Sequence, residues 1–199
     1  IITLNDGIRQ EGQQWGDEHG IEIDEFSADR VEILKGPASL MYGSDAMAGV
    51  INILSTPSVA EGTAGGAFIY NYQTNNRMHG LSGMQNGNMH GIQWMLRGSI
   101  KNAASYHNAY DGYVLNSGFK EYGISGNVGI NRKWGFTHLL FSNFSQQPGM
   151  IEGERDSLSG KFLKPAVLAG GIPGYEVATQ HDLMNRNLMI PRQQIRHTK

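Results

Sequence analysis

One stretch of this sequence constrains the fold more than any other: "GIQWMLRGSIK", residues 91–101, alternates between apolar and polar side chains. A period of two indicates a β-strand, because successive side chains of a strand point to opposite faces of the sheet. One face would carry Ile92, Trp94, Leu96, Gly98 and Ile100, and the other Gln93, Met95, Arg97, Ser99 and Lys101. Residues 120–130 repeat the pattern, with Tyr122, Ile124, Gly126, Val128 and Ile130 opposite Glu121, Gly123, Ser125, Asn127 and Gly129. Two folds fit: a soluble half-buried sheet, or transmembrane barrel strands whose apolar face meets lipid.

The connections between strands favour the barrel. We expect strands near residues 65–73, 78–85, 89–101, 119–130 and 136–145, with tight turns at "QNGN" (85–88) and "NRKWG" (131–135). Residues 102–118 and 150–194 are predicted as long loops. The short turns would then lie at one end of the strands and the long loops at the other, which is typical of outer-membrane barrels. Since a barrel needs at least about 8 strands, most of it is expected beyond Lys199.

The first 58 residues predict a different unit, a small mixed α/β structure. Strands are expected at Ile1–Leu4, Val31–Leu34 and Val50–Leu54, and the turn signal Asn5-Asp6-Gly7 follows the first of them. Asp24 is a plausible N-cap for a short helix. Pro37 is expected to begin a helical turn that Gly43 ends. The predicted core of this unit is a strand, a tight crossover of small residues, and a second strand.

Composition and motifs exclude several functions. Sixteen basic residues against 18 acidic ones give no basic surface for nucleic acid, and the absence of cysteine excludes disulfides and thiolate chemistry. No apolar run reaches the roughly 18 residues of a membrane helix, and no signal peptide opens the chain. Both ends are expected to be cuts within a longer chain. No serine lies in a Gly-x-Ser-x-Gly elbow, and "GTAGGA" (62–67) lacks the Lys-Ser/Thr of a phosphate loop, so no catalytic residue is assigned.

The segment "RVEILKGPASLMYGSDAMAGVINI", which begins at Arg30, resembles the plug-domain signature of TonB-dependent outer-membrane receptors. The resemblance implies an α+β plug, here residues 1–58, inside an antiparallel transmembrane β-barrel of about 22 strands that begins in residues 59–199. It implies import of a scarce solute with energy relayed by the inner-membrane protein TonB, whose contact segment would precede residue 1. Lys35-Gly36-Pro37 favours the branch that imports ferric siderophores or similar metal chelates, haem or cobalamin over the branch that imports glycans or peptides.

The same resemblance implies where the plug meets the barrel wall. The small residues of the signature would let the plug backbone pack closely against its own strands and the wall. The implied contact residues are Lys35, Gly36, Tyr42, Gly43, Asp45 and Gly49. The family commonly has arginine at the position of Lys35. A lysine is a point charge that cannot form the forked contact of a guanidinium, so its salt bridge to the wall would be weaker.

Two segments are candidates for contact with the solute. In the plug loop "RQEGQQWGDEHG", residues 9–20, the candidates are Gln14, Trp15, Asp17, Glu18 and His19, which can stack on, hydrogen-bond or ligate a solute. Tyr106, His107 and Tyr110 of the first long loop would add an external aromatic surface. The bland alternatives are a solvated polar loop and an interfacial aromatic belt. A bare-metal site is disfavoured because no second histidine lies near His19, so no cofactor is assigned and any metal would arrive within the solute.

Three functions remain open at this point. The first is an uptake receptor in a Gram-negative outer membrane, in contact with lipid, the solute and the TonB complex. The second is a surface receptor of the same architecture that signals when occupied. The third is a soluble β-rich adhesin, in which residues 62–145 would fold in water as a monomer. An apolar row facing lipid would instead make that segment aggregate without detergent.

Overall fold

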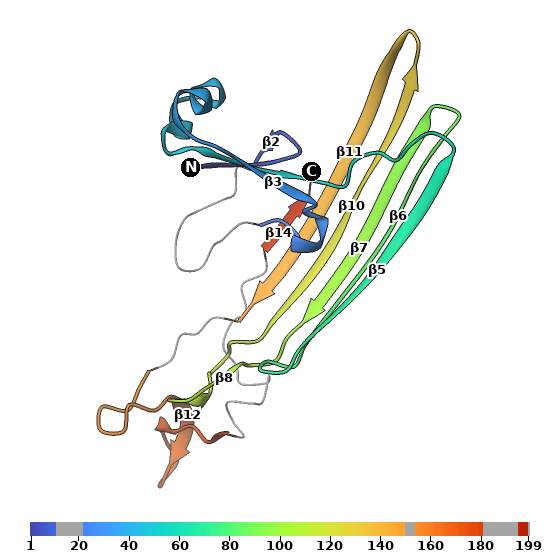
Figure 1. The fold of residues 1–199 in the computed structure, drawn as a ribbon. Coiled ribbons are helices and arrows are strands. Elements are labelled where there is room, and N and C mark those ends of the chain that lie inside the picture. The colour runs from blue at the N-terminus through green and yellow to red at the C-terminus, as the bar shows by residue number, and fades with distance from the viewer. Residues whose placement is uncertain (11–21, 150–153, 181–194, 199) are drawn as a thin grey trace.

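A computed structural model describes residues 1–10, 22–149, 154–180 and 195–198. The described residues form a small sheet at the N-terminal end, a long sheet, and two short hairpins (Figure 1). Figure 1 shows the small sheet, in blue, beside the long strands, and the orange β12–β13 hairpin near the end of the strands where β8 lies. Within the described ranges, no helix has the length and apolar character needed to cross a membrane.

The small sheet is mixed, as the sequence predicts. It contains β1 (Ile2–Asn5), β2 (Ile8–Arg9), β3 (Arg30–Leu34) and β4 (Val50–Leu54) in the order β2-β1-β4-β3. β1 and β4 run parallel, and the other two pairs are antiparallel. The turn between β1 and β2 uses Asp6 and Gly7, both with positive φ. We call this sheet and its short helices the plug segment. Its core contains Ile2, Leu4, Ala46 and Val50.

Three 3-10 helices complete the plug segment: η1 (Glu25–Ser27), η2 (Gly36–Tyr42) and η3 (Ser44–Ala48). Asp24 caps η1 by accepting from the Phe26 N–H at 3.1 Å, which confirms the predicted N-cap. The expected close backbone approach is found at Gly49. Its φ is 115°, and a Cβ atom there would lie 3.0 Å from the Leu34 carbonyl oxygen. The crossover of small residues, η2 and η3, joins β3 to β4, which are neighbouring antiparallel strands.

The long sheet is antiparallel throughout. It contains β5 (Thr63–Gln73), β6 (Met78–Met89), β7 (Ile92–Asn102), β10 (Phe119–Arg132), β11 (Gly135–Pro148) and β14 (Ile195–Thr198). The order is β14-β11-β10-β7-β6-β5. The longer connections, residues 74–77 and 103–118, lie at one end of the strands, and the two tight turns lie at the other. The boundary between plug and barrel at residues 58 and 59 stays a prediction.

The two faces of this sheet have the predicted composition. Ile92, Leu96 and Ile100 of β7 are exposed, and so are Tyr122 and Ile130 of β10, the cross-strand partners of Ile100 and Ile92. The opposite face of β7 is buried, where Gln93, Met95, Arg97 and Lys101 lie on the side of the plug segment. This sheet is apolar on its exposed face and polar on its covered face. A soluble half-buried sheet has the opposite arrangement, whereas a membrane barrel wall has this one.

One predicted turn is wrong. "QNGN" does not turn: β6 continues through it, and the chain reverses at His90 and Gly91, which have φ of 53° and 72°. Two consecutive positive φ values are typical of the type I′ turn that joins hairpin strands. Gly87 serves packing instead, because a Cβ atom there would lie 2.2 Å from Cζ2 of the Trp94 ring. The turn at 131–135 is confirmed, with Arg132 paired to Gly135.

The expectation of one long loop over residues 150–194 is also wrong in its described part. Residues 163–177 form a hairpin of β12 (Leu163–Leu168) and β13 (Ile172–Val177) that turns at Gly170 and Gly171. Two prolines and a glycine within the strands hide its alternation in the sequence. The predicted loop 102–118 likewise contains a short hairpin of β8 (His107–Asn108) and β9 (Gly112–Tyr113).

Candidate functional site

The described parts of the two long loops fold together. Val114 and Leu115 of the first loop pack with Phe162 and Ala178 of the second. We call residues 103–118 and 154–180 the loop cluster. Its apolar core is separate from that of the plug segment, so the loop cluster has packing of its own.

The loop cluster contains all three predicted aromatic ligand residues. Tyr110 is 75% exposed, and His107 is exposed with its ring edge-to-face against Tyr113 at 5.3 Å. Tyr106 is partly buried and packs against the core of the cluster. The structure therefore presents two of the three side chains at the surface, whereas Tyr106 supports the cluster from within.

An ion pair ties the two loops to each other. Arg155 Nη1 lies 2.7 Å from Asp111 Oδ1, and its guanidinium carbon lies 3.9 Å from the centroid of the Phe162 ring. Arg155 also donates to the Gly160 carbonyl at 2.8 Å, and Asn108 donates to the Asp111 carboxylate at 3.1 Å. The hydrogen bond from Arg155 holds the pKa of the Asp111 carboxyl below its ordinary value, and Asp111 raises the pKa of Arg155.

This ion pair predicts how the loop cluster responds to acid. A carboxyl whose folded pKa is lowered stabilises the fold above its ordinary pKa of 3.8, and the contribution disappears as the pH falls through the lower folded value. We expect slow proteolysis of residues 103–118 and 154–180 between pH 5 and 7, and faster cleavage by pepsin below about pH 4. Arg155→Met should make cleavage nearly independent of pH in that window. An equally steep dependence in Arg155→Met would assign the acid effect to other groups.

The predicted plug-loop residues Gln14, Trp15, Asp17, Glu18 and His19 lie outside the described residues. The flanking residues place the two ends of this segment: β2 ends at Arg9, and η1 begins at Glu25 on the buried face of the long sheet. Their contact with a solute therefore stays a prediction.

The predicted plug–barrel contact residues occupy one end of the plug segment. Lys35, Gly36, Tyr42, Gly43 and Asp45 are exposed, and Gly49 is buried. Asp45 pairs with Arg9 of β2 at 2.7 Å. The Gly43 N–H donates to the Leu40 carbonyl and ends η2, and the Gly49 N–H donates to the Ala46 carbonyl and ends η3. A contact of these six residues with a barrel wall stays a prediction.

Several contacts between plug segment and long sheet come from η1 and its cap Asp24, and Arg97 of β7 also donates to Thr56, just after β4, at 3.1 Å. The Ser99 hydroxyl of β7 donates to Asp24 Oδ2 at 2.6 Å, and Lys101 Nζ lies 3.0 Å from Glu25 Oε1. The Phe26 ring lies over Gly80 of β6, where a Cβ atom would come within 3.2 Å of Cζ. We call η1 with Asp24 the anchor of the plug on the wall.

On the wall side, Lys101 has a second and better buried partner. Its Nζ lies 2.9 Å from Glu121 Oε2 of β10, and Gln146 of β11 donates to Glu121 Oε1 at 2.8 Å. The Lys101 and Glu121 side chains are 7% and 13% exposed, whereas Glu25 is 64% exposed. An exposed ion pair contributes about 0–1 kcal/mol, but breaking a buried one costs several times more.

The sequence-based expectations did not include this network, although a signal for it exists. Lys101 and Glu121 both fall on the polar face of the predicted strands, and they are direct cross-strand partners in the observed register. Opposite charges in that position attract. The plug partner was not predictable, because the side of the wall that Glu25 meets depends on how the plug segment sits against the sheet.

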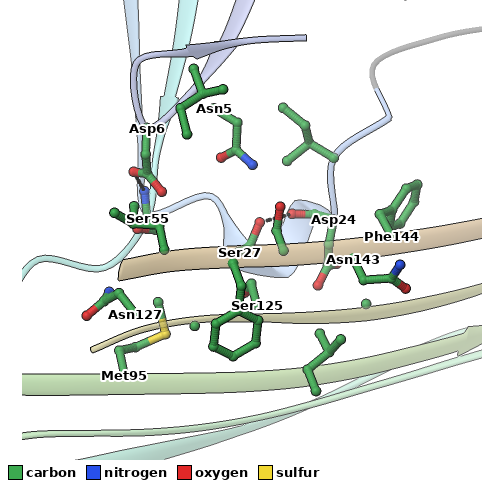
Figure 2. Close-up of a pocket in the computed structure, with 18 of the residues that line it drawn as sticks. Asn5, Asp6, Asp24, Ser27, Ser55, Met95, Ser125, Asn127, Asn143 and Phe144 are labelled. Carbon is green, nitrogen blue, oxygen red and sulfur yellow. Dashed lines mark hydrogen bonds between the residues drawn. The ribbon is translucent and has the colours of Figure 1, made fainter. Parts of the chain in front are cut away.

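A cavity of about 100 Å³ lies beside the anchor, between plug segment and wall (Figure 2). Asp6, Asp24 and Ser27 line its plug side, and Ser125 and Asn127 of β10 line its wall side. The Asp6 carboxylate is held in place because its Oδ1 accepts from the Ser55 N–H at 2.8 Å. Among the described residues, no group of three or more histidine, aspartate or glutamate side chains is arranged to hold a metal ion.

Comparison with known proteins places the two parts of the chain. Residues 1–50 match the family described as TonB-dependent Receptor Plug Domain. The hemin receptor of Yersinia pestis is 45% identical over 51 residues, which are 26% of this chain and 7% of that receptor. The vitamin B12 transporter BtuB of Vibrio vulnificus (strain CMCP6) is 41% identical over 58 residues, which are 29% of this chain and 9% of that transporter.

Two solved receptors share the fold. The siderophore receptor PirA from Acinetobacter baumannii matches 81% of this chain and 27% of its own, with a TM-score of 0.58 and 18% identity. A mutant of the ferric enterobactin receptor PfeA from Pseudomonas aeruginosa, in complex with enterobactin, matches 73% of this chain and 25% of its own, with a TM-score of 0.53 and 17% identity. The chain thus spans about a quarter of the solved receptors, and its matches to curated relatives span less than a tenth of their length. Residues 1–50 thus match the plug-domain family of TonB-dependent receptors, and the described residues share the fold of solved siderophore receptors.

Proposed function

We propose that this chain belongs to an outer-membrane receptor that imports a ferric siderophore or similar metal chelate, haem or cobalamin. The observation that carries the proposal is the pairing of a plug-family segment with a sheet that is polar toward the plug and apolar on its exposed face. An apolar exposed face suits lipid, and a wall filled by a plug suits controlled passage rather than an open pore. The relatives named as hemin receptor, vitamin B12 transporter and siderophore receptor support this choice of solutes.

The proposal includes partners and location. The receptor would lie in the outer membrane of a Gram-negative bacterium, with the exposed apolar face in the bilayer and the loop cluster outside the cell. Energy would come from the TonB complex of the inner membrane, because the sequence contains no nucleotide-binding motif. The protein would need no cofactor of its own, since any metal would enter as part of the solute.

Within this receptor, we place solute contacts on the plug loop and the loop cluster. Gln14, Trp15, Asp17, Glu18 and His19 combine an aromatic ring, an amide, two carboxylates and an imidazole. His107 and Tyr110 add exposed rings on a cluster with its own core. Chelates and macrocycles present flat or polar surfaces, which such side chains bind by stacking and hydrogen bonding.

Binding to whole cells tests these contacts. Cells that express the complete gene, and cells from which it is deleted, are given labelled ferric siderophores, haem and cobalamin. We expect one of these to bind only when the gene is present, and Trp15→Ala with His19→Ala to weaken that binding at least about tenfold, or 1.4 kcal/mol. Trp134→Ala, an exposed aromatic residue of the 131–135 turn outside the plug loop and the loop cluster, is the matched control. Unchanged affinity in the double variant would remove the plug loop from the site.

A further inference from the structure

The face of the long sheet that points away from the plug segment, here called the outward face, has a sharp boundary between apolar and polar side chains. Exposed apolar or aromatic residues lie on the side of the boundary nearer the tight turns: Leu81 of β6, Ile100 of β7, Tyr122 of β10 and Phe141 of β11. The next outward residues toward the loop cluster are polar: His79, Asn102, Lys120 and Asn143.

This boundary crosses the strands at a slant. Figure 1 shows β5, β6, β7, β10 and β11 side by side. His79, Asn102 and Lys120 are cross-strand partners in turn, but on β11 the polar positions continue from Gln147, the partner of Lys120, down to Asn143. Strands of a membrane barrel tilt by about 35–45° from its axis, so a boundary parallel to the membrane surface crosses them obliquely. In the proposed receptor, the boundary is where the outward face leaves the hydrocarbon on the side of the loop cluster.

Lys120 is a cation of this boundary that no carboxylate balances. Within β5, β6, β7, β10 and β11, no aspartate or glutamate occupies an outward position, because Glu121, the acidic residue of these strands, faces the plug side. No ion pair or hydrogen bond joins Lys120 to the described part of the chain. Arg132, the outward cation at the other end of β10, instead donates to the His90 carbonyl. An ammonium at the edge of hydrocarbon without a carboxylate attracts an anion from its surroundings.

His79 brings a hydrogen-bond donor to the same boundary. Tyr70 Oη lies 2.9 Å from His79 Nδ1, and the Tyr72 ring centroid lies 4.9 Å from that of His79. Both tyrosines belong to β5, so they hold the imidazole from one side. When the Tyr70 hydroxyl donates to Nδ1, the neutral ring carries its hydrogen on Nε2 and can donate it to a ligand.

The spacing of these residues suits a phosphate group. Asn102 is the direct cross-strand partner of both His79 and Lys120. Neighbouring strands lie about 4.8 Å apart, so the backbones of His79 and Lys120 are about 10 Å apart, with Asn102 between them. The long lysine side chain and the imidazole can therefore reach one tetrahedral anion above Asn102. A phosphate accepts several charge-assisted hydrogen bonds at once.

We propose that Lys120, Asn102 and His79 bind the phosphate group of a lipid in the outer leaflet, the lipid A of lipopolysaccharide. The inference rests on the proposed outer-membrane location and adds a lipid site on the outside of the wall, separate from the solute contacts. Lys120 supplies the positive charge, and His79 Nε2 donates to a phosphate oxygen. Ile100 and Tyr122, on the hydrocarbon side of the boundary, lie beside the acyl chains.

Lipid binding to the full-length receptor in neutral detergent micelles tests the site. The probe is fluorescently labelled lipid A that carries both phosphates. We expect Lys120→Met to weaken its binding about fivefold, the effect of one lysine at an anionic lipid surface. Lys120→Arg should bind as the unmodified receptor does, because a guanidinium also pairs with phosphate. With lipid A from which both phosphates have been removed, Lys120→Met and the unmodified receptor should bind equally.

The controls separate a site from general attraction. Lys133→Met removes the same charge from the exposed 131–135 turn at the other end of the strands, and it should leave the affinity unchanged. Equal losses in Lys120→Met and Lys133→Met would overturn the site. Displacement of the lipid by millimolar inorganic phosphate would overturn the choice of a lipid and assign the residues to free phosphate.

A second variant covers the case in which Lys120→Met does not fold. Asn102→Asp places a carboxylate directly opposite Lys120, where it competes with the phosphate for the ammonium. We expect at least about fivefold weaker binding of lipid A, and unchanged affinity would contradict the proposal. Failure of the unmodified receptor to insert into phospholipid vesicles would overturn the outer-membrane location itself. Normal insertion without a preference for lipid phosphate would overturn the lipid site alone.

Discussion

Lys101→Met is expected to lower the free energy of unfolding of the receptor by about 3–5 kcal/mol, because it removes one partner of a buried ion pair. Methionine fills a similar volume but cannot pair with Glu121. The Glu121 carboxylate, 13% exposed, would then be left with the Gln146 amide as its remaining hydrogen-bond donor among these residues. Denaturant titration of the receptor in detergent micelles measures the loss.

Two further variants show whether the loss in the free energy of unfolding comes from the unpaired Glu121 carboxylate. Adding Glu121→Gln to Lys101→Met should recover part of the stability, because a neutral amide is cheaper to bury than an unpaired charge. Glu25→Gln alone should cost less than about 1 kcal/mol, since that partner is exposed. A loss below about 1 kcal/mol in Lys101→Met would show that the pair contributes little to the wall.

The second large effect concerns the exposed apolar face. Leu96 is the middle member of the row Ile92, Trp94, Leu96, Gly98 and Ile100, and it is 50% exposed in the structure. If this face meets the bilayer, Leu96→Arg places a cation near the centre of the hydrocarbon. We expect a loss of about 2–4 kcal/mol in the free energy of unfolding from phospholipid vesicles.

A matched arginine near the tight turn gives the control. Ile130 lies on the same face, two residues before the end of β10, where the strand approaches the membrane surface. Ile130→Arg should therefore cost no more than about 1 kcal/mol. Equal costs at the two positions, or a Leu96→Arg variant that is more stable in water than in lipid, would favour the soluble adhesin.

The sequence predicts the two faces of the long sheet better than it predicts the turns and the β12–β13 hairpin. Two-residue alternation places Leu96 and Lys101 on opposite faces, and burial in the structure confirms both. The predicted turn at "QNGN" is wrong because glycine also occurs in a strand that must make room for a neighbour, as Gly87 does for the Trp94 ring. The β12–β13 hairpin escaped detection because proline and glycine interrupt its period.

The candidate site is less predictable for a physical reason. Alternation fixes the face of Lys101 and Glu121, but the partner from the plug is Glu25, which lies far upstream in the sequence and reaches Lys101 through tertiary packing. The Asp24 cap was predicted from local chemistry, whereas its second bond, to Ser99, needs the assembled interface. Local sequence rules identify which hydrogen bonds or ion pairs a side chain can form. The packing of the plug segment against the long sheet determines the partner with which it forms them.

Uptake of the bound solute is the most direct test of the proposed function. Cells with and without the complete gene are compared, each with the inner membrane energised or with its proton gradient dissipated. We expect uptake that requires both the gene and the gradient. Solute binding that depends on the gene, with uptake that depends on neither, would contradict import and favour a receptor that signals.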